Sequence, residues 1–125
     1  MESGKPLPES KGEIAYAASF LDYYAGEAIR PTSSGGGTII PTTFIDATSS
    51  SPKGKILSFK EAIGVTAMIT PWNFPLAMIT RKVGPALATG CTSIVKPSEL
   101  TPLSAIALKS LCDKAGIPKG VFELL

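Results

Sequence analysis

Two short segments place polar side chains next to prolines, and each follows an apolar run. In ITPWNFP (residues 69–75), Asn73 lies between two prolines. In KPSE (residues 96–99), Lys96 and Glu99 flank a proline and a serine. Because proline cannot donate a backbone hydrogen bond, both segments are typical of strand ends rather than strand interiors. The side chains at these two ends are the first candidates for chemistry.

Asn73 has two interpretations that the residues alone leave open. Asparagine is among the best helix N-cap residues and a helical pattern follows it, so a structural cap is the favoured interpretation. Alternatively, its side-chain amide donates a hydrogen bond to an oxyanion in a cleft, with the flanking prolines fixing its position.

The charged candidates also have two interpretations each. For an isolated K-x-x-E the favoured interpretation is a solvated ion pair of Lys96 and Glu99, and the alternative is that both hydrogen-bond the ribose hydroxyls of a nucleotide. No Gly-x-Gly-x-x-Gly follows the first strand, so such a nucleotide would be held without the standard fingerprint. Arg81 and Lys82 follow Asn73 by about two helical turns. They are either an exposed basic pair or cations of the cleft, and the arginine fork suits a carboxylate.

Composition excludes several other kinds of chemistry. The 125 residues contain no histidine, so a Ser-His-Asp triad and a His-based metal site are excluded within them. Cys91 and Cys112 are far apart, which argues against a zinc module and a disulfide framework, and we expect both to be buried. The net charge is +2 with scattered basic residues, which does not indicate nucleic-acid binding. No apolar stretch is long enough to span a bilayer, and no secretory signal is readable.

The N-terminal half of the sequence predicts a helix and two strand-like segments. Apolar residues spaced three and four apart predict a helix over residues 11–29, whereas the residues before it indicate no element. Pro31 and the serine and glycine run after it end the helix. TIIPTTF (residues 38–44) and KILSF (residues 55–59) are strand-like, and the turn-forming DATSSSPKG between them favours a hairpin or two extended arms.

The second half alternates strands and helices. The predicted elements are a strand buried on both faces in IGVTAMI, a helix over 75–89, a strand at CTSIVK, a helix capped by Thr101, and a strand at VFELL. The order β-α-β-α-β predicts a parallel, doubly wound α/β sheet with right-handed crossovers. Ligands bind beyond the carboxyl ends of such strands, where both polar segments lie. Because three strands with helices on one face are poorly covered, we expect a fragment of a larger protein.

Residues 64–108, from GVTAMITPWNFP to TPLSAIAL, resemble the opening of the NAD(P)-binding domain of aldehyde dehydrogenases. ESGKPLPESKGEIAYAASFLDYYAGEA resembles the segment that precedes it in that family. PWNFP, GPALATGCT and VKPSE together are highly specific, and AMITRK resembles the succinate-semialdehyde branch most closely. The resemblance divides the chain into an N-terminal segment and helix (1–37), a β-extension for oligomerisation (38–61) and a truncated NAD(P)-binding part (62–125).

The resemblance implies a role for each matching residue. Asn73 would stabilise the oxyanion of a cysteine thiohemiacetal. Lys82 would lie near the active centre in a structural or proton-relay role, and Arg81 would bind the substrate carboxylate. The residues implied in binding NAD or NADP are Ile69, Thr70, Pro71, Trp72, Lys96, Ser98 and Glu99. Ser98 permits a 2′-phosphate whereas Glu99 would repel one, so the choice of cofactor stays open.

The implied activity is NAD(P)-dependent oxidation of succinate semialdehyde to succinate. The family's nucleophilic cysteine and glutamate base would lie beyond Leu125, so we expect the 125 residues to be inactive alone. Two alternatives stay open: another semialdehyde or general aldehyde as substrate, or a non-catalytic truncated product that docks on intact subunits. The parent would be a homo-oligomer, a dimer or tetramer, in the cytoplasm or mitochondrial matrix, without nucleic-acid or membrane partners.

Overall fold

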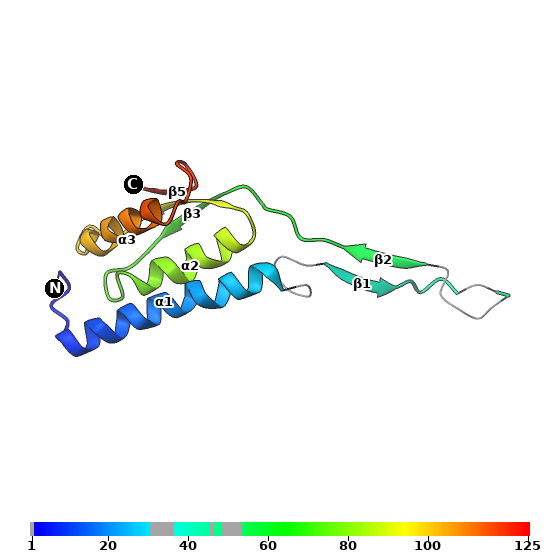
Figure 1. Ribbon diagram of the computed structural model, residues 1–125, viewed down its shortest axis with the longest axis horizontal. Helices are drawn as coiled ribbons and strands as arrows, with labels where there is room; N and C mark the ends of the chain where they lie inside the picture. Colours follow the sequence, from blue (N-terminus) through cyan, green and yellow to red (C-terminus); the bar gives the residue numbers. More distant parts are fainter. Residues whose placement is uncertain (1, 31–36, 46, 49–53) are drawn as a thin grey trace.

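The computed structural model describes residues 2–30, 37–45, 47–48 and 54–125. Helices and a small sheet form a body, and a two-stranded arm extends away from it (Figure 1). The elements in chain order are α1 (Leu7–Ile29), β1 (Thr38–Pro41), β2 (Lys55–Ser58), β3 (Val65–Ile69), α2 (Ala77–Ala88), β4 (Thr92–Lys96), α3 (Pro102–Lys114) and β5 (Phe122–Leu124). Most of the predicted turn DATSSSPKG, and the segment from Pro31 that ends the first helix, lie outside the described residues.

The body is built on a parallel sheet in the order β3-β4-β5, which confirms the predicted α/β fold and the β-α-β-α-β succession. Along β4 the side chains alternate, as a strand requires. Ser93 and Val95 are buried, whereas Ile94 between them is 37% exposed. The residues buried with Val95 come from both crossover helices, so α2 and α3 cover one face of the sheet.

The other face of the sheet has no cover within the described residues. Val65 and Ile69 of β3 are 69% and 76% exposed. The prediction that this strand is buried on both faces is therefore wrong for these residues, although its apolar composition is that of a doubly covered strand. The exposed apolar face is one that a larger protein would cover.

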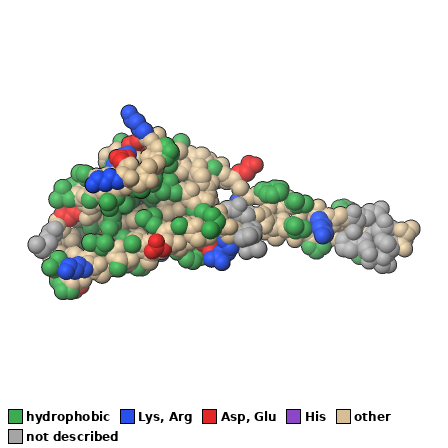
Figure 2. All heavy atoms as spheres, viewed as in Figure 1, with side chains coloured by type: hydrophobic (Ala, Val, Ile, Leu, Met, Phe, Trp, Pro, Cys, Tyr) green, Lys and Arg blue, Asp and Glu red, His purple; other side chains and the backbone are tan. Residues whose placement is uncertain are grey.

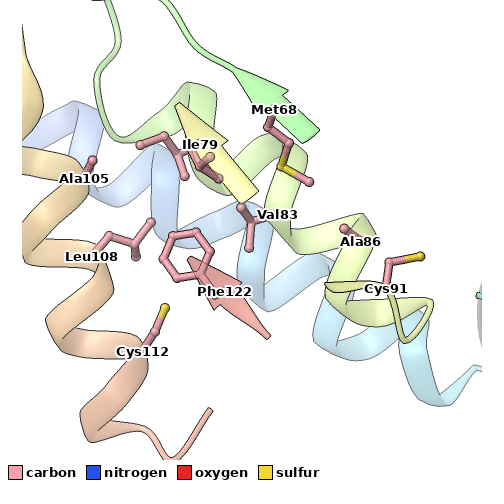
Figure 3. Close-up of a cluster of buried hydrophobic side chains, with 10 residues drawn as sticks. Met68, Ile79, Val83, Ala86, Cys91, Ala105, Leu108, Cys112 and Phe122 are labelled. Carbon is pink, nitrogen blue, oxygen red and sulfur yellow. The ribbon is translucent and has the colours of Figure 1, made fainter. Parts of the chain in front are cut away.

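The core lies between the sheet and the two crossover helices. Figure 3 shows the Phe122 ring of β5 facing Leu108 and Cys112 of α3, with Ile79 and Val83 of α2 close by. Cys91 and Cys112 are both buried and unpaired, as the sequence predicted. The cluster comprises Met68, Ile79, Val83, Ala86, Cys91, Val95, Ala105, Leu108, Cys112 and Phe122.

α1 packs lengthwise on α2 rather than on the sheet (Figure 1). A Cβ placed on Gly84 would lie 2.8 Å from Cδ2 of Tyr24, closer than real contacts allow, so glycine permits this approach. The helix begins earlier than predicted, at Leu7, with Pro8 in its first turn. Proline is tolerated there because first-turn N–H groups have no intrahelical partner. The expectation of no element before residue 11 is therefore wrong for residues 7–10.

The arm is an antiparallel pair in which Ile39 lies opposite Leu57 and Ile40 opposite Ile56. This confirms the hairpin among the two predicted alternatives. Every residue of both strands is exposed. Figure 2 shows hydrophobic side chains along the surface of the arm. Its use in oligomerisation, and the division of the chain at residues 37 and 61, stay predictions.

Candidate functional site

The two polar segments lie at one edge of the sheet. Ile69 at the end of β3 pairs with Lys96 at the end of β4, and the Thr70 N–H donates to the Lys96 carbonyl oxygen at 3.2 Å. The loop after β3 (residues 70–76, the β3 loop) and the loop after β4 (residues 97–101, the β4 loop) therefore start side by side. This is the arrangement predicted from the parallel order of the strands.

The start of the β3 loop combines exposed apolar residues with one buried polar residue. Ile69 is 76% exposed and Trp72 is 54% exposed, and Pro71 between them is also exposed. Thr70 is only 4% exposed, and its Oγ1 has no hydrogen-bond partner among the described residues. The segment thus offers an apolar wall to solvent together with one buried, unpaired hydroxyl, a group that usually has a partner.

The Asn73 side chain is exposed and makes no hydrogen bond to any residue that the structure describes. The N-cap of α2 is Leu76, which has no side-chain oxygen. The cap interpretation of Asn73 is therefore wrong, and its amide is free for another partner. The helix itself begins at Ala77 rather than at the predicted residue 75.

A carboxylate from α1 supplies the missing cap. Glu13 is 7% exposed, and its Oε1 accepts hydrogen bonds from the backbone N–H groups of Leu76 at 3.0 Å and Ala77 at 3.5 Å. A negative charge at a helix N-terminus is favourable because the free N–H groups and the helix dipole both point toward it.

The second oxygen of Glu13 holds a lysine from the N-terminal segment. Lys5 Nζ lies 2.6 Å from Glu13 Oε2 and donates a further bond to the Asn73 carbonyl oxygen at 2.9 Å. The same ammonium lies 4.0 Å from the centre of the Phe74 ring. Neither Glu13 nor Lys5 was among the site residues predicted from the sequence. The sequence contains one signal for Glu13, because it lies four residues before Ala17 and therefore shares a helix face with an apolar residue.

The β4 loop is more open. Lys96 and Glu99 form an ion pair at 3.4 Å, with side chains 52% and 81% exposed. The hydrogen bond from its own backbone N–H, helped by Lys96, holds the pKa of Glu99 below its ordinary value. Ser98 is half-buried, and its Oγ accepts a bond from the Leu100 N–H at 3.3 Å. Both charged groups are thus available to a ligand at this edge.

α3 is also capped from a distance. Thr101 is the N-cap residue, as predicted, but its Oγ1 is buried and makes no bond to the described residues. Instead Glu2 accepts hydrogen bonds from the Leu103 N–H at 2.7 Å and the Ser104 N–H at 2.9 Å. Partial burial alone would raise the pKa of Glu2, but the hydrogen bonds from Ser104 and Leu103 outweigh it and the pKa is lowered.

Arg81 and Lys82 are both exposed on α2. Lys82 lines a surface pocket beside β3 that also includes Thr66 and Met68. No hydrogen bond or ion pair joins either cation to Asn73 in the part of the chain that the structure describes. Their proposed roles thus rest on sequence resemblance. The described residues contain no group of His, Cys, Asp and Glu side chains that could hold a metal ion, and none of their helices is long and apolar enough to cross a membrane.

Comparisons with known proteins agree on one family. The model of the aldehyde dehydrogenase family matches residues 1–125. The chain is 55% identical to glutarate-semialdehyde dehydrogenase of Pseudomonas aeruginosa, covering 100% of this chain and 24% of that protein. It is 51% identical to the NADP(+) succinate-semialdehyde dehydrogenase of Escherichia coli, again over 100% of this chain and 24% of the relative.

The fold agrees with the sequence match. The crystal structure of succinate-semialdehyde dehydrogenase from Burkholderia pseudomallei superposes with a TM-score of 0.85 at 54% identity. That match covers 99% of this chain and 23% of the solved chain. The described chain thus spans about a quarter of the length of the relatives that it matches.

Proposed function

The chain belongs to the aldehyde dehydrogenase family, and we propose that it forms the oxyanion and cofactor edge of an enzyme that oxidises a semialdehyde, preferentially succinate semialdehyde, with NAD or NADP. The observation that carries this proposal is the junction of the two strand ends. There the Thr70 N–H to Lys96 carbonyl bond brings the loop of Asn73 beside Lys96 and Glu99.

Asn73 is the proposed oxyanion donor. When a nucleophile attacks the aldehyde carbon, negative charge develops on the aldehyde oxygen, and a fixed N–H donor stabilises it. The Asn73 side chain suits this task because it is exposed, has no hydrogen-bond partner among the described residues and projects from a backbone held by Lys5. The cysteine nucleophile and the glutamate base of the proposed reaction come from other parts of the enzyme.

The sheet edge at the ends of β3 and β4 has both polar groups and an apolar surface that suit a nicotinamide cofactor. Lys96 can donate to ribose hydroxyls and the Glu99 carboxylate can accept from them. Ile69, which pairs with Lys96, and Trp72 in the β3 loop offer exposed apolar surface at the same edge. When bound, the cofactor supplies the acceptor for the hydride that leaves the aldehyde carbon.

Arg81 is the proposed ligand of the substrate's carboxylate, since its planar fork matches a carboxylate group. The names of the relatives support a dicarboxylic semialdehyde, glutarate semialdehyde in one case and succinate semialdehyde in two others. Lys82 is proposed to act near the same centre, in a structural or proton-relay role. The exposed apolar arm supports the proposal that subunits assemble through β1 and β2.

The proposal is tested with the purified enzyme that contains these residues. We expect aldehyde-dependent reduction of NAD+ or NADP+, followed by the absorbance of the reduced cofactor, with kcat/KM highest for succinate semialdehyde. Glutarate semialdehyde and an uncharged aldehyde of equal length are the comparison substrates. No reduction with any of the three would overturn the proposed activity.

Arg81→Leu separates the candidate substrates. Losing a charge-assisted contact to a carboxylate removes on the order of 1.5–3 kcal/mol, so KM for succinate semialdehyde should rise at least about tenfold. KM for the uncharged aldehyde should not change. Lys11→Leu, which removes an exposed cation from α1, is the matched control. An unchanged KM for succinate semialdehyde in Arg81→Leu would favour a general aldehyde as substrate.

A further inference from the structure

Four contacts from Lys5 and Glu13, three of them to backbone atoms and one to the Phe74 ring, hold the β3 loop from Asn73 to the start of α2. Lys5 donates to the Asn73 carbonyl oxygen at 2.9 Å, and its ammonium lies 4.0 Å from the centre of the Phe74 ring. On the other side of the loop, Glu13 accepts from the N–H groups of Leu76 and Ala77 at 3.0 and 3.5 Å. The ion pair of 2.6 Å between Lys5 and Glu13 joins the two sets of contacts into one unit.

The carboxylate of this unit is buried and its ammonium is largely shielded. The Glu13 and Lys5 side chains are 6% and 14% exposed, so water competes little for the ion pair, whereas the bond to the Asn73 carbonyl lies at the surface. A buried ion pair of this kind contributes little net stability compared with apolar residues of the same size, because both charges lose their hydration. What such a pair does provide is a fixed geometry, since each charge must keep all of its partners.

Asn73 is the residue that gains from that geometry. Its side chain has no hydrogen bond to the residues that the structure describes, so the contacts that hold Asn73 act on the backbone from which the amide projects. An oxyanion donor is effective when it is already in place before charge develops. The part of the loop that Lys5 and Glu13 immobilise is the part from which this amide projects.

We propose that Glu13 and Lys5 are positioning residues for the oxyanion donor Asn73. The inference rests on the proposed function, in which Asn73 stabilises the oxyanion of the aldehyde. Neither residue touches the substrate or the cofactor. Glu13 fixes the start of α2, Lys5 fixes the carbonyl of Asn73, and their ion pair sets the distance between those two points.

A double-mutant cycle distinguishes a positioning role from a merely structural one. It compares Glu13→Ala, Asn73→Ala and the double variant in the full enzyme. We expect Asn73→Ala to lower kcat about 10²- to 10³-fold. Glu13→Ala should lower kcat about 10- to 100-fold, the effect of a small displacement of a catalytic group. In the Asn73→Ala background, Glu13→Ala should lower kcat less than about twofold, because the group that it positions is gone.

Milder variants guard against loss of folding. Glu13→Gln keeps an oxygen acceptor for the α2 N–H groups, and we expect it to restore most of kcat. Lys5→Met keeps an apolar stem over Phe74 but removes the bond to the Asn73 carbonyl, so it should lower kcat and, again, lose its effect in the Asn73→Ala background. Asp113→Asn is the matched control, since it breaks another 2.6 Å ion pair, with Lys109, that is remote in sequence from the loop. It should leave kcat unchanged.

The outcomes distinguish the inference from the function on which it rests. If Glu13→Ala and Lys5→Met lower kcat by the same factor with and without Asn73, the pair acts on stability alone and the inference is overturned. Unchanged kcat in Asn73→Ala, in an enzyme that oxidises the aldehyde, would instead overturn the oxyanion role and the inference with it. Failure of the wild-type enzyme to oxidise any aldehyde would overturn the proposed function.

Discussion

The β3 loop and the β4 loop begin from paired residues, yet they are held in different ways. The β3 loop is held by a buried carboxylate and a largely shielded ammonium, which contact its backbone at Leu76 and at Asn73. The β4 loop follows Lys96, whose ion pair with Glu99 has side chains that are 52% and 81% exposed, and the carboxylate of Glu2 binds the start of α3 rather than the loop. The difference suits the proposed tasks. An oxyanion donor needs a fixed position, whereas groups that bind ribose hydroxyls can adjust to their ligand.

The largest expected difference between the loops is in stability. Glu13→Ala leaves the largely shielded ammonium of Lys5 without its counter-ion and two helix N–H groups without their acceptor, so we expect a loss of about 3 kcal/mol in the free energy of unfolding, the lower end of the cost of breaking a buried pair. Glu2→Ala removes a cap from α3 in a more exposed setting and should cost about 1 kcal/mol. Urea denaturation followed by circular dichroism measures both. Equal losses in the free energy of unfolding for the two variants would contradict the proposed difference between the carboxylates of Glu13 and Glu2.

The α3 cap should also respond to pH. The hydrogen bonds from Ser104 and Leu103 hold the pKa of Glu2 below its ordinary value, so they favour the ionised carboxylate in the folded state. Its contribution is complete above the pKa of glutamate in the unfolded chain and is lost as the pH falls through the lower folded pKa. The destabilisation by Glu2→Gln, measured by urea denaturation across this range, should therefore shrink as the pH is lowered. A difference that stays constant with pH would contradict an ionised cap.

The smallest expected effect concerns the choice of cofactor at the β4 loop. Because its own backbone N–H and Lys96 keep the pKa of Glu99 low, the carboxylate is ionised at neutral pH and repels a 2′-phosphate. Glu99→Gln should shift the ratio of kcat/KM for NADP+ over NAD+ upward by on the order of fivefold. Glu9→Gln, an exposed carboxylate on α1, is the control. If Glu99→Gln leaves this ratio unchanged, the 2′ position of the adenosine ribose does not lie near Glu99.

Local patterns were sufficient to predict the main architecture. Glycine and proline mark the ends of the elements, as at Gly90, whose φ of 78° ends α2 before β4. The apolar runs identify the parallel strands, and their order places both polar segments at one edge. The family assignment, which the sequence motifs indicated, is confirmed by the comparisons.

The supports of the loops could not be predicted in the same way. Glu13 lies 63 residues from Leu76, and Glu2 lies 102 residues from Ser104, so no local pattern connects them. Asparagine and threonine are both favoured caps, yet the carboxylates of Glu13 and Glu2 bind the N–H groups of the two helices instead. The burial of β3 was also mispredicted, because none of the described residues covers the outer face of the sheet at Val65 and Ile69.

The claim that the adjoining ends of β3 and β4 form the site of aldehyde oxidation is tested most directly by a crystal structure of the enzyme with NAD(P)+ and a bound aldehyde. We predict the Asn73 side-chain nitrogen within hydrogen-bond distance of the aldehyde oxygen, and the adenosine ribose hydroxyls beside Lys96 and Glu99. An aldehyde oxygen bound away from Asn73, or a cofactor at the opposite edge of the sheet, would contradict it.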